Sequence, residues 1–411
     1  MSDWKEYKLG EVADVQTGPF GSQLHMNDYK EIGTPIITVE HLVENRIIHN
    51  NLPLVGEEDR ERLNKYTLCE GDIVFSRVGS VDRRAFVSSR ENGWLFSGRC
   101  LRVRPHQSVN SRFLSYYFGL EEFKETIRRI AVGATMPSIN TSILSNVTVI
   151  LPPLYEQMQI AGVLSSLDDK IDLLNRENAT LETLAETLFR QYFIENPNPD
   201  WKEGKLGDYV IETIGGEWGK ETPEGEYDMP VRCLRGADVA DLNDGLAKRT
   251  PLRYIKRNKY DKIEPRNGDI ILEISGGTDT CSTGRVAYIN DDVKRLFDYP
   301  IVFSNFCRLL RVDECHSFFV YCFFRYLHKQ GEFFNLENGS SGIHNLNYKA
   351  ALYDDLGWLV PTEEKLVIEF GEKVKPYFDK INTNKKQILS LSAQRDTLLP
   401  RLMSGEVKVG E

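Results

Sequence analysis

One stretch restricts what this chain can fold into more than any other. Between Leu154 and Phe193, apolar residues recur at alternating spacings of three and four. The resulting heptad seam consists of Leu164, Leu167, Ile171, Leu174, Asn178, Leu181, Ala185, Leu188 and Tyr192. A lone helix cannot bury such a stripe, and isolated helices are only marginally stable in water. The stretch therefore predicts a long helix packed along a partner surface.

The C-terminal part of the chain supplies a matching surface. Its seam consists of Val374, Tyr377, Ile381, Asn384, Ile388, Leu391, Arg395, Leu398 and Leu402. If the helices run antiparallel and Asn178 meets Asn384, apolar residues face each other in nearly every layer, and only Arg395 against Leu167 fits poorly. A slip of one heptad would place each Asn amide against an apolar side chain, without a partner. We therefore predict an antiparallel coiled coil. The alternative is that each helix packs on its own globular neighbour.

The chain also repeats itself, with a period of about half its length. Residues 4–11 return as residues 201–208, and residues 71–74 return as residues 268–271. Two units are too few for a solenoid. The repeat therefore indicates duplication of one globular domain followed by one helix. The predicted boundaries are 1–153 for the first domain, 154–195 for the central helix, 196–361 for the second domain and 362–411 for the C-terminal helix.

Each domain mixes short strands with an aromatic-rich helix. In the first domain the predicted strands are 35–39, 99–104 and a β-rich run at 146–151, residues 71–76 are a turn leading into a further strand, and the predicted helix is 111–129. In the second domain they are 230–234 and 269–274, with a helix at 317–329. We therefore predict an α+β fold with two similar globular domains separated by the helix pair. Such an arrangement would have a pseudo-two-fold axis.

Composition limits the classes of function. The net charge of −10 argues against a protein that coats nucleic acid, because such binding rises with the number of phosphates neutralised. If the chain binds DNA, it must use local patches or the charge of a partner. Seven cysteines without a Cys-x-x-Cys pair argue against a disulfide framework or a zinc ribbon, and predict reduced core thiols. No signal peptide and no run of eighteen apolar residues appears, so we expect the cytosol and no membrane span.

The candidate binding chemistry lies in loops between the predicted strands. Residues 77–84 carry guanidinium groups suited to phosphate contact or to guanine readout. Their counterpart, residues 275–285, is longer and polar, and a second loop pair lies at 133–138 and 340–345. The candidate DNA-binding residues are Arg77, Ser80, Arg83, Arg84, Thr135, Ser138, Ser275, Thr278, Thr280, Arg285, Ser340, Ser341 and His344. A repeated framework with divergent tips is typical of two readers tuned to different targets, although neutral loop drift gives the same pattern.

Signatures of catalysis and metal binding are weak. Residues 215–221 resemble a P-loop, but the glycine spacing is wrong and no Ser or Thr follows Lys220. Cys315, His316, Cys322 and His328 suit metal ligation by residue type, but they lie at the start of or within the aromatic helix, which favours core packing. We therefore predict no catalytic residue, no metal site and no cofactor in this chain.

Six motifs in order along the whole chain resemble the DNA-specificity (S) subunit of Type I restriction-modification systems. They are residues 4–11, 71–80, 96–97, 133–140, 151–157 and 398–407. Two departures limit what can be carried over. Asp82 stands where the family often has Gly, and residues 272–274 replace the Phe-Ser-Arg of the first copy, so recognition residues cannot be transferred there.

The resemblance implies a non-catalytic subunit with two target-recognition domains. Each domain would read one half of a bipartite, asymmetric site in double-stranded DNA, while the helix pair sets the spacer. The implied partners are two modification (adenine methyltransferase) subunits, which carry S-adenosylmethionine, and restriction/translocase subunits driven by ATP. Two other classes stay open: a self-contained nuclease or methyltransferase, which would need a catalytic signature, and a purely structural coiled-coil adaptor.

Overall fold

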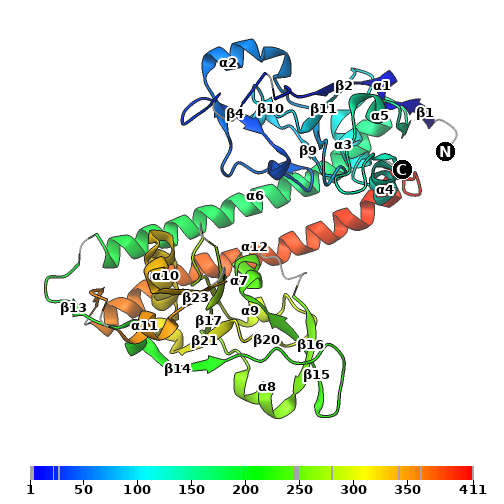
Figure 1. The fold of residues 1–411 in the computed structure, drawn as a ribbon. Helices are drawn as coiled ribbons and strands as arrows, with labels where there is room; N and C mark the ends of the chain where they lie inside the picture. The colour runs from blue at the N-terminus through cyan, green and yellow to red at the C-terminus, as the bar shows by residue number, and fades with distance from the viewer. Residues whose placement is uncertain are drawn as a thin grey trace. The chain divides into compact units, whose positions relative to one another are not determined.

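The structure is a computed structural model that describes residues 4–21, 23–25, 28–195, 197–243, 250–278, 281–340, 343–354, 356–361 and 363–409. The chain forms two compact units. Unit 1 comprises Met1–Lys170 and Ser392–Glu411, and unit 2 comprises Ile171–Leu391. The two predicted long helices are present as α6 (Leu154–Phe193) and α12 (Glu364–Met403), each continuous over 40 residues (Figure 1). Together with the sheets of both units, they confirm the predicted α+β class.

Unit 1 holds the first globular domain. Its strands are β1 (Lys5–Lys8), β2 (Ala13–Thr17), β3 (Tyr29–Lys30), β4 (Thr34–Ile37), β5 (Leu42–Val43), β6 (Arg46–Ile47), β7 (Leu54–Val55), β8 (Ile73–Ser76), β9 (Arg84–Phe86), β10 (Leu95–Phe96), β11 (Cys100–Pro105) and β12 (Thr148–Leu151). Its short helices are α1 (Leu9–Val12), α2 (Glu57–Arg62), α3 (Ser111–Tyr117), α4 (Glu121–Ile130) and α5 (Thr141–Ser145). An antiparallel sheet of order β2-β11-β8-β9 forms its centre.

The core of unit 1 explains why these segments form. All four residues of β8 are buried, and Phe75 of this strand meets Phe118 at a ring-centroid distance of 5.0 Å. The predicted helix 111–129 is interrupted, because the chain turns between α3 and α4. At the turn, a Cβ on Gly119 would lie 2.9 Å from the backbone oxygen of Tyr116, besides 2.3 Å from a guanidinium nitrogen of the buried Arg84, so this close approach favours a glycine.

Unit 2 holds the second globular domain. Its strands are β13 (Lys202–Glu203), β14 (Val210–Gly215), β15 (Tyr227–Leu234), β16 (Leu252–Lys256), β17 (Ile270–Glu273), β18 (Ser275–Gly277), β19 (Val286–Tyr288), β20 (Ile301–Phe303), β21 (Cys307–Val312), β22 (Glu337–Ser340), β23 (Ile343–Leu346) and β24 (Leu359–Val360). Its helices besides α6 and α12 are α7 (Gly236–Asn243), α8 (Arg257–Ile263), α9 (Asp291–Lys294), α10 (Glu314–Gln330) and α11 (Tyr348–Tyr353). The predicted helix at 317–329 is α10.

The sequence repeat is a structural repeat. The sheet β14-β21-β17-β19 has the same strand order and pairing as β2-β11-β8-β9. Even the register agrees, since Ser76 faces Cys100 in unit 1 and Glu273 faces Cys307 in unit 2. The repeated Asn140 and Asn347 are both helix N-caps, whose side-chain oxygens accept backbone N–H bonds at 2.8 and 3.2 Å.

The two long helices pair antiparallel within each unit. In unit 2, Asn384 Nδ2 donates to Asn178 Oδ1 at 2.9 Å, and the rings of Tyr192 and Phe370 lie 6.0 Å apart. Unit 1 contains the junction that looked poor in sequence. There Arg395 does not face an apolar residue alone, because its Nη1 donates to Asp168 Oδ1 at 2.9 Å. Asp168 also accepts a 2.6 Å bond from the Tyr116 hydroxyl of α3.

The seam residues divide by burial. Buried members are Leu164, Ile171, Leu174, Asn178, Ala185, Val374, Ile381, Asn384 and Leu402, and half-buried members are Leu167, Leu181, Leu188, Tyr192, Tyr377, Ile388, Leu391, Arg395 and Leu398. The seams also join the domain cores: Leu164 belongs to the core cluster of the first domain, and Ile381 to that of the second. Helix pairing and packing on the globular neighbour, treated as alternatives in sequence, therefore occur together. Among the described helices, none is long and apolar enough to span a membrane.

Candidate nucleic-acid interface

In unit 1 the structure brings together the two predicted loops. The backbone N–H of Ile139, at the end of loop 133–138, donates to the carbonyl of Arg77 in loop 77–84 at 3.0 Å. A β-bridge between Val78 and Ser138 continues this contact. The two loops are therefore one surface, although nearly fifty residues of sequence separate them.

The side chains of this surface differ in exposure and in the contacts that hold them. Arg77 is half-buried: its Nη1 donates to the Gly98 carbonyl at 3.1 Å and its guanidinium lies 5.4 Å from the centre of the Phe20 ring. Arg83 is exposed, with a long 3.4 Å bond to a backbone carbonyl. Ser80 and Thr135 are exposed as well, whereas Ser138 is half-buried.

Arg84 does not fit its predicted role. It is only 8% exposed, and its Nε donates to the Ser115 carbonyl at 2.9 Å. Burial lowers the pKa of its guanidinium to about 10, and the charges of Tyr116 and Asp168 oppose that shift. The prediction failed because Arg84 is the first residue of β9, where alternation turns the side chain toward α3 rather than outward. We assign it to the core of unit 1.

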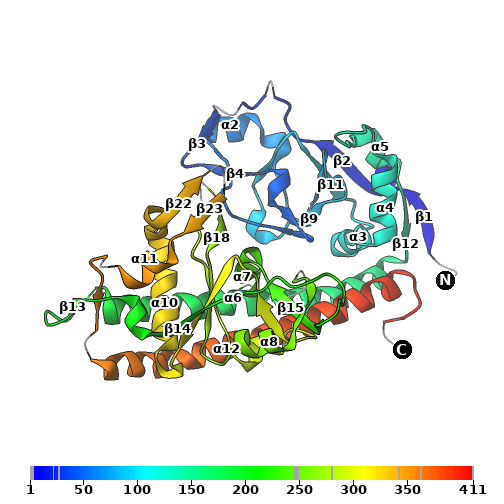
Figure 2. The ribbon, with the colours of Figure 1, turned by 60° about the horizontal axis from the view of Figure 1, so that its bottom comes forward.

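Unit 2 joins its own two loops in the same way. β18 pairs antiparallel with β23, so that Ser275 faces Asn345 and Gly277 faces His344. The bond from Leu346 N to the Ile274 carbonyl, at 3.0 Å, matches the bond from Ile139 to Arg77 in unit 1. Figure 2 shows β22, β23 and β18 as one small sheet.

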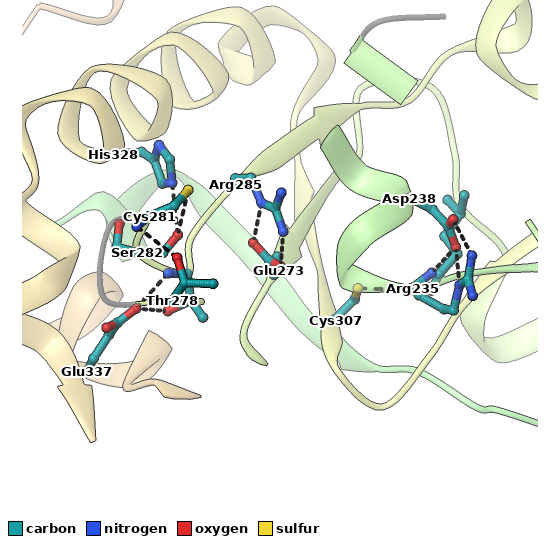
Figure 3. A network of polar contacts seen from close by, with 12 residues as sticks. Arg235, Asp238, Glu273, Thr278, Cys281, Ser282, Arg285, Cys307, His328 and Glu337 are labelled. Atoms are coloured by element: carbon teal, nitrogen blue, oxygen red, sulfur yellow. Dashed lines mark hydrogen bonds and ion pairs between the residues drawn. The ribbon is translucent and has the colours of Figure 1, made fainter. Parts of the chain in front are cut away.

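A polar network holds this second surface (Figure 3). Arg285 makes two bonds to the buried carboxylate of Glu273, from Nε at 2.7 Å and from Nη2 at 2.5 Å. Glu337 accepts from the backbone N–H and the hydroxyl of Thr283 at 2.6 and 2.7 Å, and its other oxygen lies 2.8 Å from His344 Nδ1. Arg285 and His344 are thus fixed in position by carboxylates.

The remaining candidate residues of unit 2 differ in exposure, and some lie outside the described residues. Thr278 is exposed, and its hydroxyl accepts the backbone N–H of Cys281 at 3.1 Å. Ser275 is buried. Thr280, Ser341 and the side chain of Ser340 lie outside the described residues.

Sequence reasoning missed one feature that recurs in both units, an aromatic residue with an arginine on its ring. Phe20 in unit 1 and Trp218 in unit 2 each follow a glycine by two residues, and each carries an arginine on its ring. For Trp218 the partner is Arg253, whose guanidinium carbon is 4.2 Å from the ring centre. Phe20 is 51% exposed beside Arg77, so it joins the candidate interface as an aromatic surface on which a base could stack. The sequence signal that could have revealed this feature is an aromatic residue two positions after a glycine in both copies of the repeat.

A metal centre finds no support among the residues that the structure describes, where no group of three His, Cys, Asp or Glu side chains is placed to hold an ion. Of the four candidate ligands, Cys322 is buried in the core cluster of unit 2. His328 points its Nε2 to the Ser282 carbonyl at 3.1 Å (Figure 3).

Comparisons with known proteins agree with this architecture. Residues 1–183 match the family described as Type I restriction modification DNA specificity domain. The Type I restriction enzyme MjaIX specificity subunit of Methanocaldococcus jannaschii is 24% identical, over 100% of this chain and 94% of the relative. The HindI specificity subunit of Haemophilus influenzae is 23% identical, over 99% of this chain and 100% of the relative.

A solved structure supports the fold. The S subunit of the Type I restriction-modification system from M. genitalium superimposes with a TM-score of 0.58 at 16% identity, covering 97% of this chain and 96% of that one. Similarity thus extends over both domains and both long helices. Over its whole length the chain is thus similar to specificity subunits of Type I restriction-modification enzymes, and its residues 1–183 match the family's DNA specificity domain.

Proposed function

We propose that this chain selects the DNA sequence on which a Type I restriction-modification enzyme acts, and that it catalyses no reaction itself. In this proposal each globular domain reads one half of a bipartite, asymmetric double-stranded site. The pair of α6 and α12 sets the spacer and docks two modification subunits. The functional divisions follow the predicted boundaries 1–153, 154–195, 196–361 and 362–411, and the complex works in the cytoplasm.

The observation that carries the proposal is the matched joining of loops in both units. Equivalent backbone bonds, from Ile139 to Arg77 in unit 1 and from Leu346 to Ile274 in unit 2, join the equivalent pair of loops in each unit. The side chains at the matching positions are unlike, since a half-buried arginine in one copy is replaced by an isoleucine in the other. A shared frame with different side chains suits two readers of different half-sites.

Charge supports a role for partners in DNA binding. The chain has a net charge of −10, so its own phosphate contacts must be local. Subunits that close around the duplex would share those contacts. We propose that S-adenosylmethionine and ATP bind to the modification and restriction/translocase subunits, respectively, and that neither binds to this chain.

The test is to co-express the chain with an adenine-methyltransferase (modification) subunit and to map the methylated adenines. A split, asymmetric motif is expected. In the same assay Arg83→Ala, an exposed change in unit 1, should relax one half of the motif only, whereas Thr278→Ala in unit 2 should affect the other half.

Other outcomes would select the competing classes. Methyl transfer by the purified chain alone would favour a self-contained enzyme. Failure to bind DNA even with the modification subunit present would favour a structural adaptor. A continuous motif without a gap would contradict the division of reading between two domains.

A further inference from the structure

A pocket in unit 1 takes no part in the interface described above. Its cavity volume is about 530 Å³. Trp4 and Tyr117 contribute aromatic walls, and Leu120, Ile150 and Met403 contribute apolar surface. The pocket thus lies where β1, β12 and the start of α4 meet the end of α12.

Two carboxylates at this pocket lack a counter-ion. Glu6 and Glu122 are exposed, and neither forms an ion pair with any residue that the structure describes. The neighbouring Glu121, in contrast, is neutralised by Arg128 at 2.8 Å. Lys8, on the same face of β1 as Glu6, donates to the Thr148 hydroxyl at 3.0 Å instead.

The local environment is electronegative. The pKa of the Tyr117 hydroxyl is raised, first by burial and further by the charges of Glu122 and Glu6. Those two carboxylates therefore act on the same aromatic wall. Aromatic faces and uncompensated carboxylates together favour a cation, and the apolar surface beside them favours a cation carried on an aliphatic stem.

The second unit shows that the fold does not require this opening. Trp201, the counterpart of Trp4, is only 7% exposed, because the ring of Phe193 covers it at a centroid distance of 6.1 Å. Phe193 is the last residue of α6, and the last residue of α12 is Met403. At the position where unit 2 has the ring of Phe193, unit 1 has the side chain of Met403, which has no ring, and Trp4 stays half-buried.

We propose that this pocket, which we call the Trp4 pocket, receives an arginine or lysine side chain of a modification subunit. The inference rests on the proposed function, because it takes that subunit as the partner. The cation lies between Glu6 and Glu122 against Trp4 and Tyr117, and its aliphatic stem lies along Leu120 and the exposed Ile150. DNA does not fit this pocket, since its phosphates would meet two unpaired carboxylates.

The first test measures binding of the full chain to its modification subunit in the double variant Glu6→Gln/Glu122→Gln. Both residues are exposed, so the fold is expected to survive. Affinity should fall about tenfold at about 50 mM salt, and the difference from wild type should shrink at about 300 mM salt. The matched control is Glu58→Gln/Glu125→Gln, which removes two exposed charges from α2 and α4 outside the pocket and should bind like wild type.

A second variant tests the shape. Met403→Phe places in unit 1 the aromatic side chain that closes the counterpart in unit 2, and should weaken binding of the modification subunit about tenfold or more at both salt concentrations. Equal affinity of wild type and Glu6→Gln/Glu122→Gln would overturn the Trp4 pocket while leaving the proposed function intact. If the wild-type chain did not bind the modification subunit at all, both the Trp4 pocket and the proposed function would be overturned.

Discussion

Arg83 and Arg285 occupy matching positions at the two candidate interfaces but have different neighbours. The carbonyl of each accepts a 2.9 Å bond from the opposite strand, from Ser76 N in unit 1 and from Glu273 N in unit 2. Glu273 then binds the Arg285 guanidinium, whereas the Ser76 hydroxyl donates to a backbone carbonyl at 2.8 Å. One exchange of a serine for a glutamate thus fixes the direction of one arginine and leaves the other exposed.

This pairing predicts that Arg285→Ala will destabilise unit 2 as well as impair DNA binding. Removing one partner leaves the buried Glu273 carboxylate uncompensated, which costs about 3 kcal/mol of folding free energy. The double variant Arg285→Ala/Glu273→Gln should recover much of that loss in urea denaturation, because no buried charge is left unpaired. If DNA binding stays weak in the stable double variant, Arg285 contacts DNA. If stability does not recover, the ion pair is not the cause.

The seven cysteines fall into two groups by exposure. Core thiols were predicted for all seven, but Cys69, Cys281 and Cys315 are exposed. Burial raises the pKa of Cys100, Cys233, Cys307 and Cys322 to about 12, so these thiols stay protonated near neutral pH.

We therefore expect two phases when the native chain reacts with a thiol reagent at about pH 8. Cys69, Cys281 and Cys315 should react first, and the other four only after denaturant is added. Peptide mapping of the labelled sites checks this assignment. Early labelling of Cys322, which is packed in the core of unit 2, would contradict it.

At the scale of elements, the two long helices owe their register to one polar layer. Asn384 Nδ2 donates both to Asn178 Oδ1 and to Glu177 Oε2, each at 2.9 Å. Both Asn side chains are buried. Apolar layers tolerate a slip better than this one, since a displaced amide would be buried without a partner.

The element-scale prediction is that Asn178→Leu keeps the fold but loosens the register. Asn384 would lose an acceptor, at a cost of about 1–3 kcal/mol, and Asn178→Leu/Asn384→Leu should recover part of it. Disulfide trapping between the helices and mapping of the methylated spacer measure register directly. Unchanged helix pairing and unchanged spacer preference in Asn178→Leu would count against a role for this layer.

What the sequence predicted at this scale depended on periodicity and repetition. Both long helices, their antiparallel pairing and the duplication of one globular domain could be read from patterns within the chain, whereas the order of the strands in the shared sheet could not. The ion pair of Arg395 with Asp168 could not, because the carboxylate lies one position outside the seam. The burial of Arg84 was missed for a related reason: a guanidinium at a loop end looks exposed until the packing of α3 against β9 is known.

At the scale of the whole molecule, the compact units do not follow the order of the chain. The core of unit 1 is completed by the end of α12, where Leu402 and Met403 are 2% and 4% exposed and pack with Leu164 and the first domain. Linear boundaries such as 1–153 cannot show this, because the contributing segments lie at opposite ends of the sequence. Unit 1 therefore needs the C-terminus, whereas unit 2 is formed by one continuous segment.

This difference predicts an unequal response to truncation after Leu391. Loss of residues 392–411 would expose the apolar side of α6 around Leu164 and leave Asp168 without Arg395, while unit 2 keeps all its segments. Hydrogen exchange in β8 should therefore become faster, and exchange in β17 should stay unchanged. A synthetic peptide of residues 392–411, added in excess, should restore protection in β8, because it supplies the missing side of the core. A peptide of the same composition in scrambled order is the control, and equal loss of protection in both strands would refute the division into these two units.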